Sequence, residues 1–329
     1  CGPFFSVHSL AMPLAWKPAR LPKAHTTLEA GDATLRFYHG DCVELLRAID
    51  AGAVSAMVTS PPYNLGVSYR SYNDSLPRDS YLAWSDVWIK AAARTLSPHG
   101  SLFLNVGAKP SDPWTAMEVA QTARRHLQLQ NTIHWIKSIA IDRDTAGASA
   151  GLERDLAVGH YKPINSDRFV NDCHEFVFQF TPEGRTPLDR RAIGVAYQDE
   201  SNIARWRTGA SNRRCRGNTW FIPYETIQSR DKDRPHPATF PPRLAAYCLR
   251  LHGLSRLRLV MDPFLGLGSA AVACAELGVN FVGVEIDEGR VRLVPDHDGD
   301  DMVLLELAGT RLPLSSETVV DVLAGVPDG

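Results

Sequence analysis

A short proline-rich segment offers backbone and side-chain acceptors that could act on an amine. It reads Ser60, Pro61, Pro62 and Tyr63 and follows an apolar run typical of a buried strand. Exocyclic amines are poor nucleophiles because the nitrogen lone pair is conjugated with the ring, so an enzyme must accept their hydrogens. The Ser60 hydroxyl and the Pro61 carbonyl can do this, since consecutive prolines hold an extended backbone. Tyr63 offers a ring face for an extruded base. The alternative is a Pro-Pro turn that only closes a strand.

A second segment, residues 262–268, places closely spaced glycines after another apolar run. Gly266 and Gly268 suit a turn whose backbone approaches a ligand, and Glu285, 19 residues after Gly266, can accept from ribose hydroxyls. With Ala271 these glycines also satisfy the dinucleotide fingerprint. A nicotinamide-dependent dehydrogenase and a structural turn therefore stay open on this segment alone.

The cysteines exclude some chemistry. The six are widely spread, with no Cys-x-x-Cys pair and no His cluster at metal-ligand spacing, so we expect free thiols in a reducing cytoplasm and no metal site. None follows a proline, so a thiolate that attacks cytosine C6 has no candidate in such a motif. This favours direct attack by the amine, without a covalent enzyme intermediate. No apolar run reaches the roughly 20 residues of a membrane span.

The elements that must position these segments alternate between strand and helix. We expect strands at residues 34–39, 53–59, 101–106, 131–137, 258–261 and 281–285. We expect helices at 42–49, 80–96, 243–251 and 269–277, and one from Pro113 capped by Asp112. Pro98, His99 and Gly100 should stop the second helix. This order predicts an α/β fold with a doubly wound, mostly parallel sheet. Both chemical segments then lie at its carboxyl edge, where ligands bind.

The alternation breaks between residues 139 and 235, where the only convincing strand is 174–181. We expect an insertion that sits on the sheet without extending it. It contains a candidate phosphate-contacting strip without acidic residues, made of Arg205, Arg207, Arg213, Arg214 and Arg216. The net charge is only −2, but the first 284 residues hold 32 basic against 26 acidic residues. An ordinary solvated basic loop is the alternative.

Together, residues 59–64 and 262–268 resemble the beta class of DNA amino-methyltransferases, in which the catalytic motif precedes the cofactor motif. Further matches lie at residues 40–41, 94–100, 135–137 and 236–241, so the resemblance spans roughly residues 33–287. The chain departs from that family after Asp287, where a helix containing Tyr and Ala is usual.

The resemblance implies a circularly permuted, Rossmann-like fold that binds S-adenosylmethionine and methylates double-stranded DNA. Its cofactor-binding residues would be Asp41, Thr239, Phe240, Asp262, Pro263, Phe264, Gly266, Gly268, Ser269 and Glu285. Residues 60–63 would be catalytic. A leading Ser usually accompanies N4-cytosine enzymes in this family, and a leading Asp more often accompanies N6-adenine enzymes, so we expect N4 of cytosine.

The resemblance also divides the chain. The expected parts are an N-terminal extension (1–32), a catalytic half (33–138), a target-recognition insertion (139–235), a cofactor-binding half (236–289) and an acidic segment of unknown role (290–329). A bacterial cytoplasmic enzyme, a monomer or homodimer, with a cognate restriction endonuclease would fit this family. The competing hypotheses are N6-adenine methylation, a dehydrogenase that leaves residues 60–63 unexplained, and an inactive DNA-binding relative.

Overall fold

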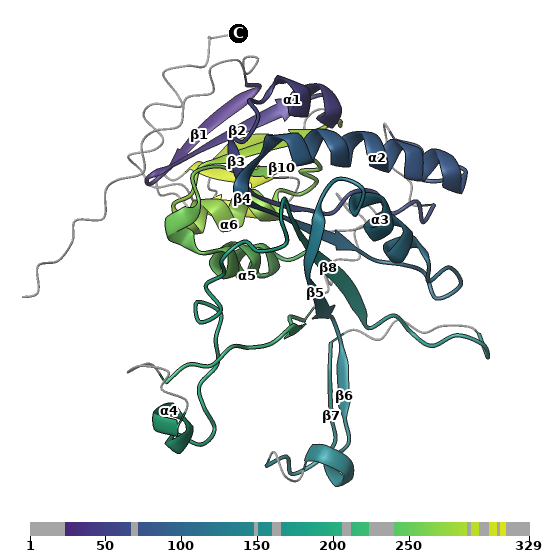
Figure 1. Cartoon of the computed structure of the whole chain (residues 1–329), viewed down its shortest axis with the longest axis vertical. Coiled ribbons are helices and arrows are strands. Elements are labelled where there is room, and N and C mark those ends of the chain that lie inside the picture. The colour runs from purple at the N-terminus through teal and green to yellow at the C-terminus, as the bar shows by residue number, and fades with distance from the viewer. Residues whose placement is uncertain are drawn as a thin grey trace, which may run out of the picture.

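A nine-stranded sheet runs through the computed structural model, with helices on both faces (Figure 1). The structure describes residues 24–66, 72–147, 151–159, 166–205, 212–223, 240–287, 291–295, 303–307 and 310–313. The strands lie in the order β1 (Thr26–Ala30), β2 (Ala33–His39), β11 (Phe281–Glu285), β10 (Val260–Asp262), β3 (Val54–Thr59), β4 (Leu96–Val106), β8 (His174–Thr181), β5 (Gln128–Ile136) and β9 (Thr219–Phe221). Five of the eight neighbouring pairs are parallel, which confirms the predicted α/β fold.

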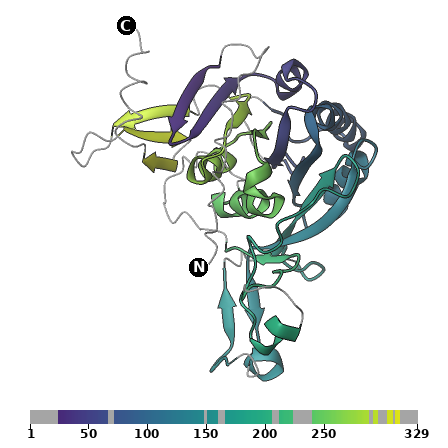
Figure 2. The ribbon, with the colours of Figure 1, turned by 60° about the vertical axis from the view of Figure 1, so that its left-hand side comes forward.

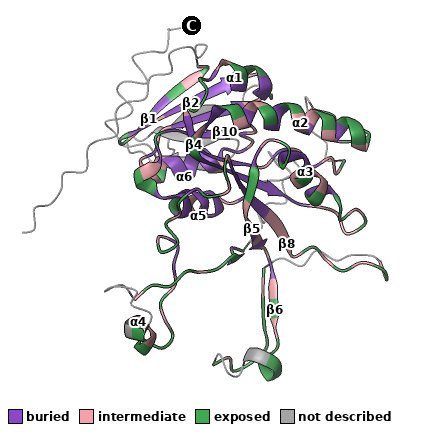
Figure 3. Cartoon of the chain, in the orientation of Figure 1, coloured by how far each residue is buried: buried purple, intermediate pink, exposed green. Residues whose placement is uncertain are grey.

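Side-chain alternation along the strands builds two cores. Leu102 and Leu104 of β4 pack with three helices on one face, α1 (Cys42–Ala48), α2 (Arg78–Thr95) and α3 (Thr115–Ala123). Phe103, between them, packs with α5 (Pro242–His252) and α6 (Ser269–Leu277) on the other face. Successive strand residues point to opposite faces, so a strand buried on both sides is apolar throughout. Figure 3 shows this buried centre of the sheet.

The centre of the sheet is a topological switch point. β3 and β10 are parallel neighbours, yet the chain leaves β3 toward β4 on one side and leaves β10 toward β11 on the other. In such sheets the crevice beyond the carboxyl ends of the two strands is where ligands bind. Residues 60–63 and 263–268 follow these two strands and meet there.

The prediction that residues 139–235 sit on the sheet without extending it is wrong. β8 lies between β4 and β5 and is antiparallel to both, and β9 forms the edge beyond β5. The strand at 174–181 was expected, but its pairing is non-local and carries no signal in the sequence. The expected extension 1–32 also needs correction, because β1 pairs with β2 and forms the opposite edge (Figure 2).

The rest of the insertion projects from the body. A hairpin of β6 (Ile139–Ile141) and β7 (Leu156–Val158) and the short helix α4 (Ser201–Arg205) extend away from the sheet on the same side (Figure 1). In the segment of unknown role, β12 (Val291–Pro295) and β13 (Val303–Leu307) form a small sheet with β14 (Thr310–Pro313). A strand therefore follows Asp287 where the family usually has a helix.

Several element boundaries differ from the prediction by a few residues, and two of them involve the start and stop signals on which the prediction relied. The residue before α3 is Trp114, and Asp112 instead binds Arg78 and the Thr115 hydroxyl, so the helix begins two residues later than expected. Pro98, His99 and Gly100 do not separate α2 from β4, because β4 already begins at Leu96. Among the described residues, no helix is long and apolar enough to cross a membrane. The described cysteines are free, as predicted.

One arginine side chain caps the C-terminal end of α1. Arg94, in the last turn of α2, donates to the backbone carbonyls of Leu46 and Ile49 at the end of α1. The last carbonyls of a helix have no partner within it, and a cation there also interacts favourably with the helix dipole.

We predict that Arg94→Met lowers the free energy of unfolding by about 1 kcal/mol, because these carbonyls lose a charged donor. Urea unfolding measures it. Lys90→Met is the matched control, since Lys90 is exposed one turn earlier on the same helix. Equal losses in the two variants would show that the contact between the helices contributes nothing.

Candidate active site

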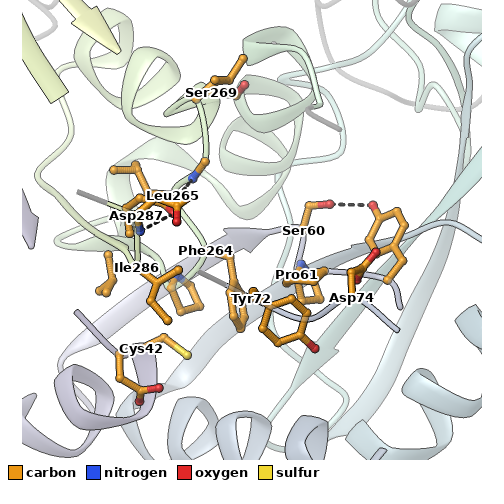
Figure 4. A pocket seen from close by; sticks show the side chains of 18 of the residues that line it. Cys42, Ser60, Pro61, Tyr72, Asp74, Phe264, Leu265, Ser269, Ile286 and Asp287 are labelled. Atoms are coloured by element: carbon orange, nitrogen blue, oxygen red, sulfur yellow. Dashed lines mark hydrogen bonds between the residues drawn. The ribbon is translucent and has the colours of Figure 1, made fainter. Parts of the chain in front are cut away.

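One pocket opens at the switch point, and both chemical segments line it. Figure 4 shows Ser60 and Pro61 on one side and Leu265, Ile286 and Asp287 on the other. Most lining residues come from the ends of β2, β3, β10 and β11 and the loops after them, together with Trp84 of α2 and Phe240 before α5. Parallel strands end at the same edge of a sheet, so segments 200 residues apart in the chain share one cavity.

The loop after β3 is held by its neighbours. The backbone N–H groups of Asn64 and Leu65 donate to the two carboxylate oxygens of Asp74, at 2.8 and 3.0 Å. Asn64 has a left-handed backbone with φ of 59°, and its side chain exchanges two hydrogen bonds with Leu76. Tyr81 of α2 donates to the Pro62 carbonyl at 2.8 Å. The proline segment is therefore fixed before any ligand arrives.

The Ser60 hydroxyl contacts the phenol of Tyr63 at 2.6 Å, the dashed contact of Ser60 in Figure 4. Tyr63 donates in turn to Glu175 of β8 at 3.1 Å. Burial, and then the negative charge of Glu175, raise the pKa of Tyr63 well above its ordinary value. The phenol stays protonated, and only 9% of Tyr63 is exposed. Sequence reasoning assigned Tyr63 to stacking and missed Glu175, whose only signal was a charge inside an apolar strand.

The glycine loop is shaped by left-handed residues and one carboxylate. Gly266 and Gly268 have φ of 53° and 77°, values that side chains other than glycine rarely adopt. Glu285 accepts from the backbone N–H of Gly266 at 2.8 Å and, through its other oxygen, from Asp287 at 3.1 Å. A carboxylate oxygen can accept more than one hydrogen bond, so Glu285 keeps capacity for ligand hydroxyls.

Asp262 lies behind this loop and does not line the pocket. It is 1% exposed and accepts from the Thr59 hydroxyl at 2.6 Å and from the Phe264 N–H at 3.0 Å. Its second oxygen is buried without a partner among the described residues. Burial raises the pKa of Asp262 to about 7, against the two hydrogen bonds, which lower it. Asp262 therefore joins the ends of β3 and β10.

Aromatic side chains make the apolar wall. The Phe264 ring packs edge-on against Trp88, with ring centres 5.1 Å apart, and at a tilt against Trp84, with ring centres 5.6 Å apart. Trp84 also lines the pocket, together with Tyr72. Cys42 lines it as well, but burial raises the pKa of its thiol to about 12, so it is no thiolate nucleophile.

Most of the predicted residues within the described ranges meet at this pocket. Its lining includes Ser60, Pro61, Pro62, Tyr63, Asp41, Phe240, Pro263, Phe264, Gly266, Ser269 and Glu285. Asp262 and Gly268 are not part of the lining, although both shape the loop. Thr239 lies outside the described residues. Tyr72, Asp74 and Trp84 also line the pocket and were not predicted. Trp84 lies on α2, and the Tyr72 ring packs against it, with ring centres 5.3 Å apart.

The predicted arginine strip is not a uniform solvated surface. Arg213 donates to the Gly194 carbonyl, and Arg216 donates to the Ile193 carbonyl and lies 5.1 Å from the Tyr247 ring centre. Arg214 is exposed, and its side chain donates to the Cys215 carbonyl at 3.4 Å, while its backbone pairs with Val195. Arg205 is exposed at the end of α4. Arg207 lies outside the described residues.

A sheet with this switch point, a glycine loop and a proline segment at one pocket defines a methyltransferase fold. The chain belongs to the DNA methylase family of N6 and N4 methyltransferases, whose family model matches residues 54–295. It is thus a beta-class amino-methyltransferase that uses S-adenosylmethionine and acts on DNA. This excludes the dehydrogenase hypothesis.

Similar proteins include enzymes of more than one kind. The type II methyltransferase M.HpaI of Haemophilus parainfluenzae is 23% identical over 261 residues, which cover 79% of this chain and 73% of that protein. The DNA adenine methyltransferase YhdJ of Escherichia coli is 21% identical over 266 residues, covering 80% and 82%. Among solved structures, a cytosine-N4-specific PvuII DNA methyltransferase aligns with a TM-score of 0.50 and 17% identity over 83% of this chain and 86% of that one.

We predict that Asp262 makes stability depend on pH. Its pKa in the folded protein, about 7, lies above the ordinary 3.8, so the stability that its protonated form contributes is fully present below about pH 4. That contribution is lost as the pH rises through 7.

Asp262→Asn should therefore flatten the change in unfolding free energy between pH 4 and pH 7, a window set by the ordinary and folded pKa values. Urea unfolding at a series of pH values measures this. The exposed Asp79→Asn, in the first turn of α2, is the control and should keep the parental curve. Parallel curves for the parent and Asp262→Asn would contradict the prediction.

Proposed function

We propose that this chain transfers a methyl group from S-adenosylmethionine to N4 of cytosine in double-stranded DNA, with Ser60 as an acceptor for the target amine. The observation that carries the proposal is the position of the Ser60 hydroxyl in the pocket that the glycine loop also lines. The neutral Ser at the head of the proline segment, where N6-adenine relatives more often have Asp, supports cytosine.

The lining residues suit S-adenosylmethionine. Phe264 offers an apolar ring, Gly266 leaves the backbone accessible, and the Glu285 carboxylate can accept from ribose hydroxyls. Phe240 and Asp41 line the same pocket. From the family resemblance we assign Phe240 to the methionine end of the cofactor and Asp41 to its adenine end. When bound, the cofactor supplies an electrophilic methyl group.

The proline segment supplies acceptors for the amine hydrogens. The Pro62 carbonyl is already bonded to Tyr81, so we assign the second acceptor beside Ser60 to the Pro61 carbonyl. Hydrogen bonds from the amine to these acceptors favour the geometry in which the nitrogen lone pair turns out of conjugation and attacks the methyl group. The carbon–sulfur bond of the donor breaks as the carbon–nitrogen bond forms, and the methylated nitrogen then loses one proton to solvent. Both groups are neutral and preorganised, and they act without a covalent enzyme intermediate.

Tyr63 does not suit the stacking role we first gave it. Its ring is buried beside Gly107, where an added Cβ would lie 3.0 Å from Tyr63 Cε2. We therefore assign Tyr63 to holding Ser60. Phe264 and Tyr72, which lie between the two sides of the pocket in Figure 4, are better placed to stack on a base or on the adenine ring.

The projecting part of residues 139–235 is our candidate for target recognition. The β6–β7 hairpin and α4 leave the body on one side, and Arg205 ends α4 (Figure 1). A projecting hairpin and an exposed arginine can contact the grooves and phosphates of a duplex. β8, within the same range, belongs to the sheet and contributes Glu175 to the site.

We predict that Ser60→Ala lowers the single-turnover rate of methylation on the order of 10²-fold or more, because the lost acceptor matters mainly in the transition state. Affinities for DNA and for S-adenosylmethionine should stay close to those of the parent. Ser80→Ala is the control, since Ser80 is exposed on α2. A parental rate in the Ser60 variant would remove its catalytic role.

Mass spectrometry of nucleosides from methylated DNA, in the same experiment, identifies the product. N4-methylcytosine is expected. N6-methyladenine would overturn the cytosine assignment while leaving the amine chemistry in place, and the absence of both, with DNA still bound, would indicate an inactive relative.

We predict that Arg214→Gln weakens DNA binding and lowers the slope of log affinity against log salt by about one, since each phosphate contact releases counterions. We choose Arg214 because replacing Arg213 or Arg216 would also remove bonds that hold residues 193–194. Arg185→Gln is the control, because Arg185 is exposed beyond the end of β8, at the sheet edge opposite the pocket. A salt slope equal to that of the parent would leave Arg214 as ordinary surface.

A further inference from the structure

A chain of hydrogen bonds leads from Ser60 into the protein, away from the pocket. Ser60 Oγ lies 2.6 Å from Tyr63 Oη, and Tyr63 Oη lies 3.1 Å from Glu175 Oε2. Glu175 is on β8, 112 residues from Tyr63 in the sequence, and its side chain is only 16% exposed. The contact thus depends on the antiparallel insertion of β8 between β4 and β5.

The direction of each hydrogen bond follows from the chemistry of its groups. A carboxylate only accepts, so the Tyr63 hydroxyl must donate its single proton to Glu175. The Tyr63 oxygen can then only accept from Ser60, and the Ser60 proton points inward. The lone pairs of the Ser60 oxygen then face the pocket, where they can accept hydrogen bonds from the target amine.

Two further donors keep Glu175 in this role. Lys137, just after β5, donates to Oε1 at 3.0 Å, and Asn105 of β4 donates to Oε2 at 2.8 Å. The Asn105 amide also donates to the Phe176 carbonyl, so two acceptors fix its orientation. Lys137 thus forms an ion pair with Glu175, and Asn105 donates a hydrogen bond to the same carboxylate.

Gly107 lies against this network, and its lack of a side chain leaves space for Tyr63 and Glu175. An added Cβ at Gly107 would lie 3.0 Å from the Tyr63 ring and 3.2 Å from Glu175 Cδ, closer than most side chains tolerate. One small cluster therefore lies behind the proline segment. It contains Asn105 of β4 and Gly107 just after it, Lys137 just after β5, and Glu175 of β8.

We propose that Glu175 is a positioning residue that, through Tyr63, orients the Ser60 hydroxyl so that its oxygen accepts from the target amine. This inference rests on the proposed function of Ser60. Glu175 does not contact the substrate. Its carboxylate sets which atom of Ser60 faces the pocket, and removing its charge lets the chain of hydrogen bonds reverse.

The first test is Glu175→Gln, which keeps the shape of the side chain but presents an amide donor to three groups that already donate, Tyr63, Asn105 and Lys137. We expect the single-turnover methylation rate to fall on the order of tenfold, with affinities for DNA and S-adenosylmethionine within about twofold of the parent. Glu183→Gln, at an exposed glutamate just after β8, should behave like the parent.

A double-mutant cycle separates orientation from general structural support. If Glu175 acts through Ser60, Glu175→Gln should not slow methylation further once Ser60→Ala is present. Tyr63→Phe provides a second route: it breaks the chain at its middle, and Glu175→Gln should add nothing to it. Multiplicative losses in these backgrounds would overturn the inference, as would a parental rate for Glu175→Gln.

A spectroscopic readout tests the network without turnover. With tyrosine labelled by ¹³C at Cζ, the Tyr63 resonance, assigned by its loss in Tyr63→Phe, should shift in Glu175→Gln and not in Glu183→Gln. An unshifted resonance would show that Glu175 does not control the phenol. If Ser60→Ala alone keeps the parental rate, the proposed function fails; if Ser60→Ala is slow and Glu175→Gln is not, only the role of Glu175 fails.

Discussion

The hydrogen bond from Thr59 to Asp262 joins the two halves of the site. It is buried, 2.6 Å long, and links the last residues of the parallel strands β3 and β10 at the topological switch point. Asp262 also binds the backbone N–H of Phe264 and so begins the glycine loop. Burying a carboxyl group without hydrogen-bond partners costs free energy. The bonds that Asp262 accepts from Thr59 and Phe264 therefore hold the ends of β3 and β10 in a fixed relative position.

Helices on both faces of the sheet support the pocket. α2 holds the proline segment through Tyr81 and the cofactor side through Trp84, which packs on Phe264. From the other face, Ser269 at the start of α6 donates to the Phe240 carbonyl. Packing of rigid helices, rather than the loops themselves, therefore sets the distance between the bound methyl donor and the amine acceptors that we propose.

The segment between residues 139 and 235 combines two functions. Its projecting parts suit contacts with DNA, while β8 completes the sheet and brings Glu175 behind Ser60. In our proposals, one segment of the chain therefore contains both the hairpin that contacts the target DNA and the carboxylate that positions Ser60. Arg213 and Arg216 show the same mixture, because they hold backbone carbonyls as well as carrying charge.

The sequence by itself determined the local structure and the two chemical segments. Residues 269–277 and 281–285 form the predicted α6 and β11, because helical spacing, the stop at Gly278 and an apolar run are all local signals. The sequence also placed residues 60–63 and 262–268 at one edge, since both follow parallel strands. Only the tertiary structure decided that Asp262 is buried behind the pocket and that Glu175 reaches Tyr63. Those contacts arise from strand pairing and burial between distant segments, which periodicity and residue type do not encode.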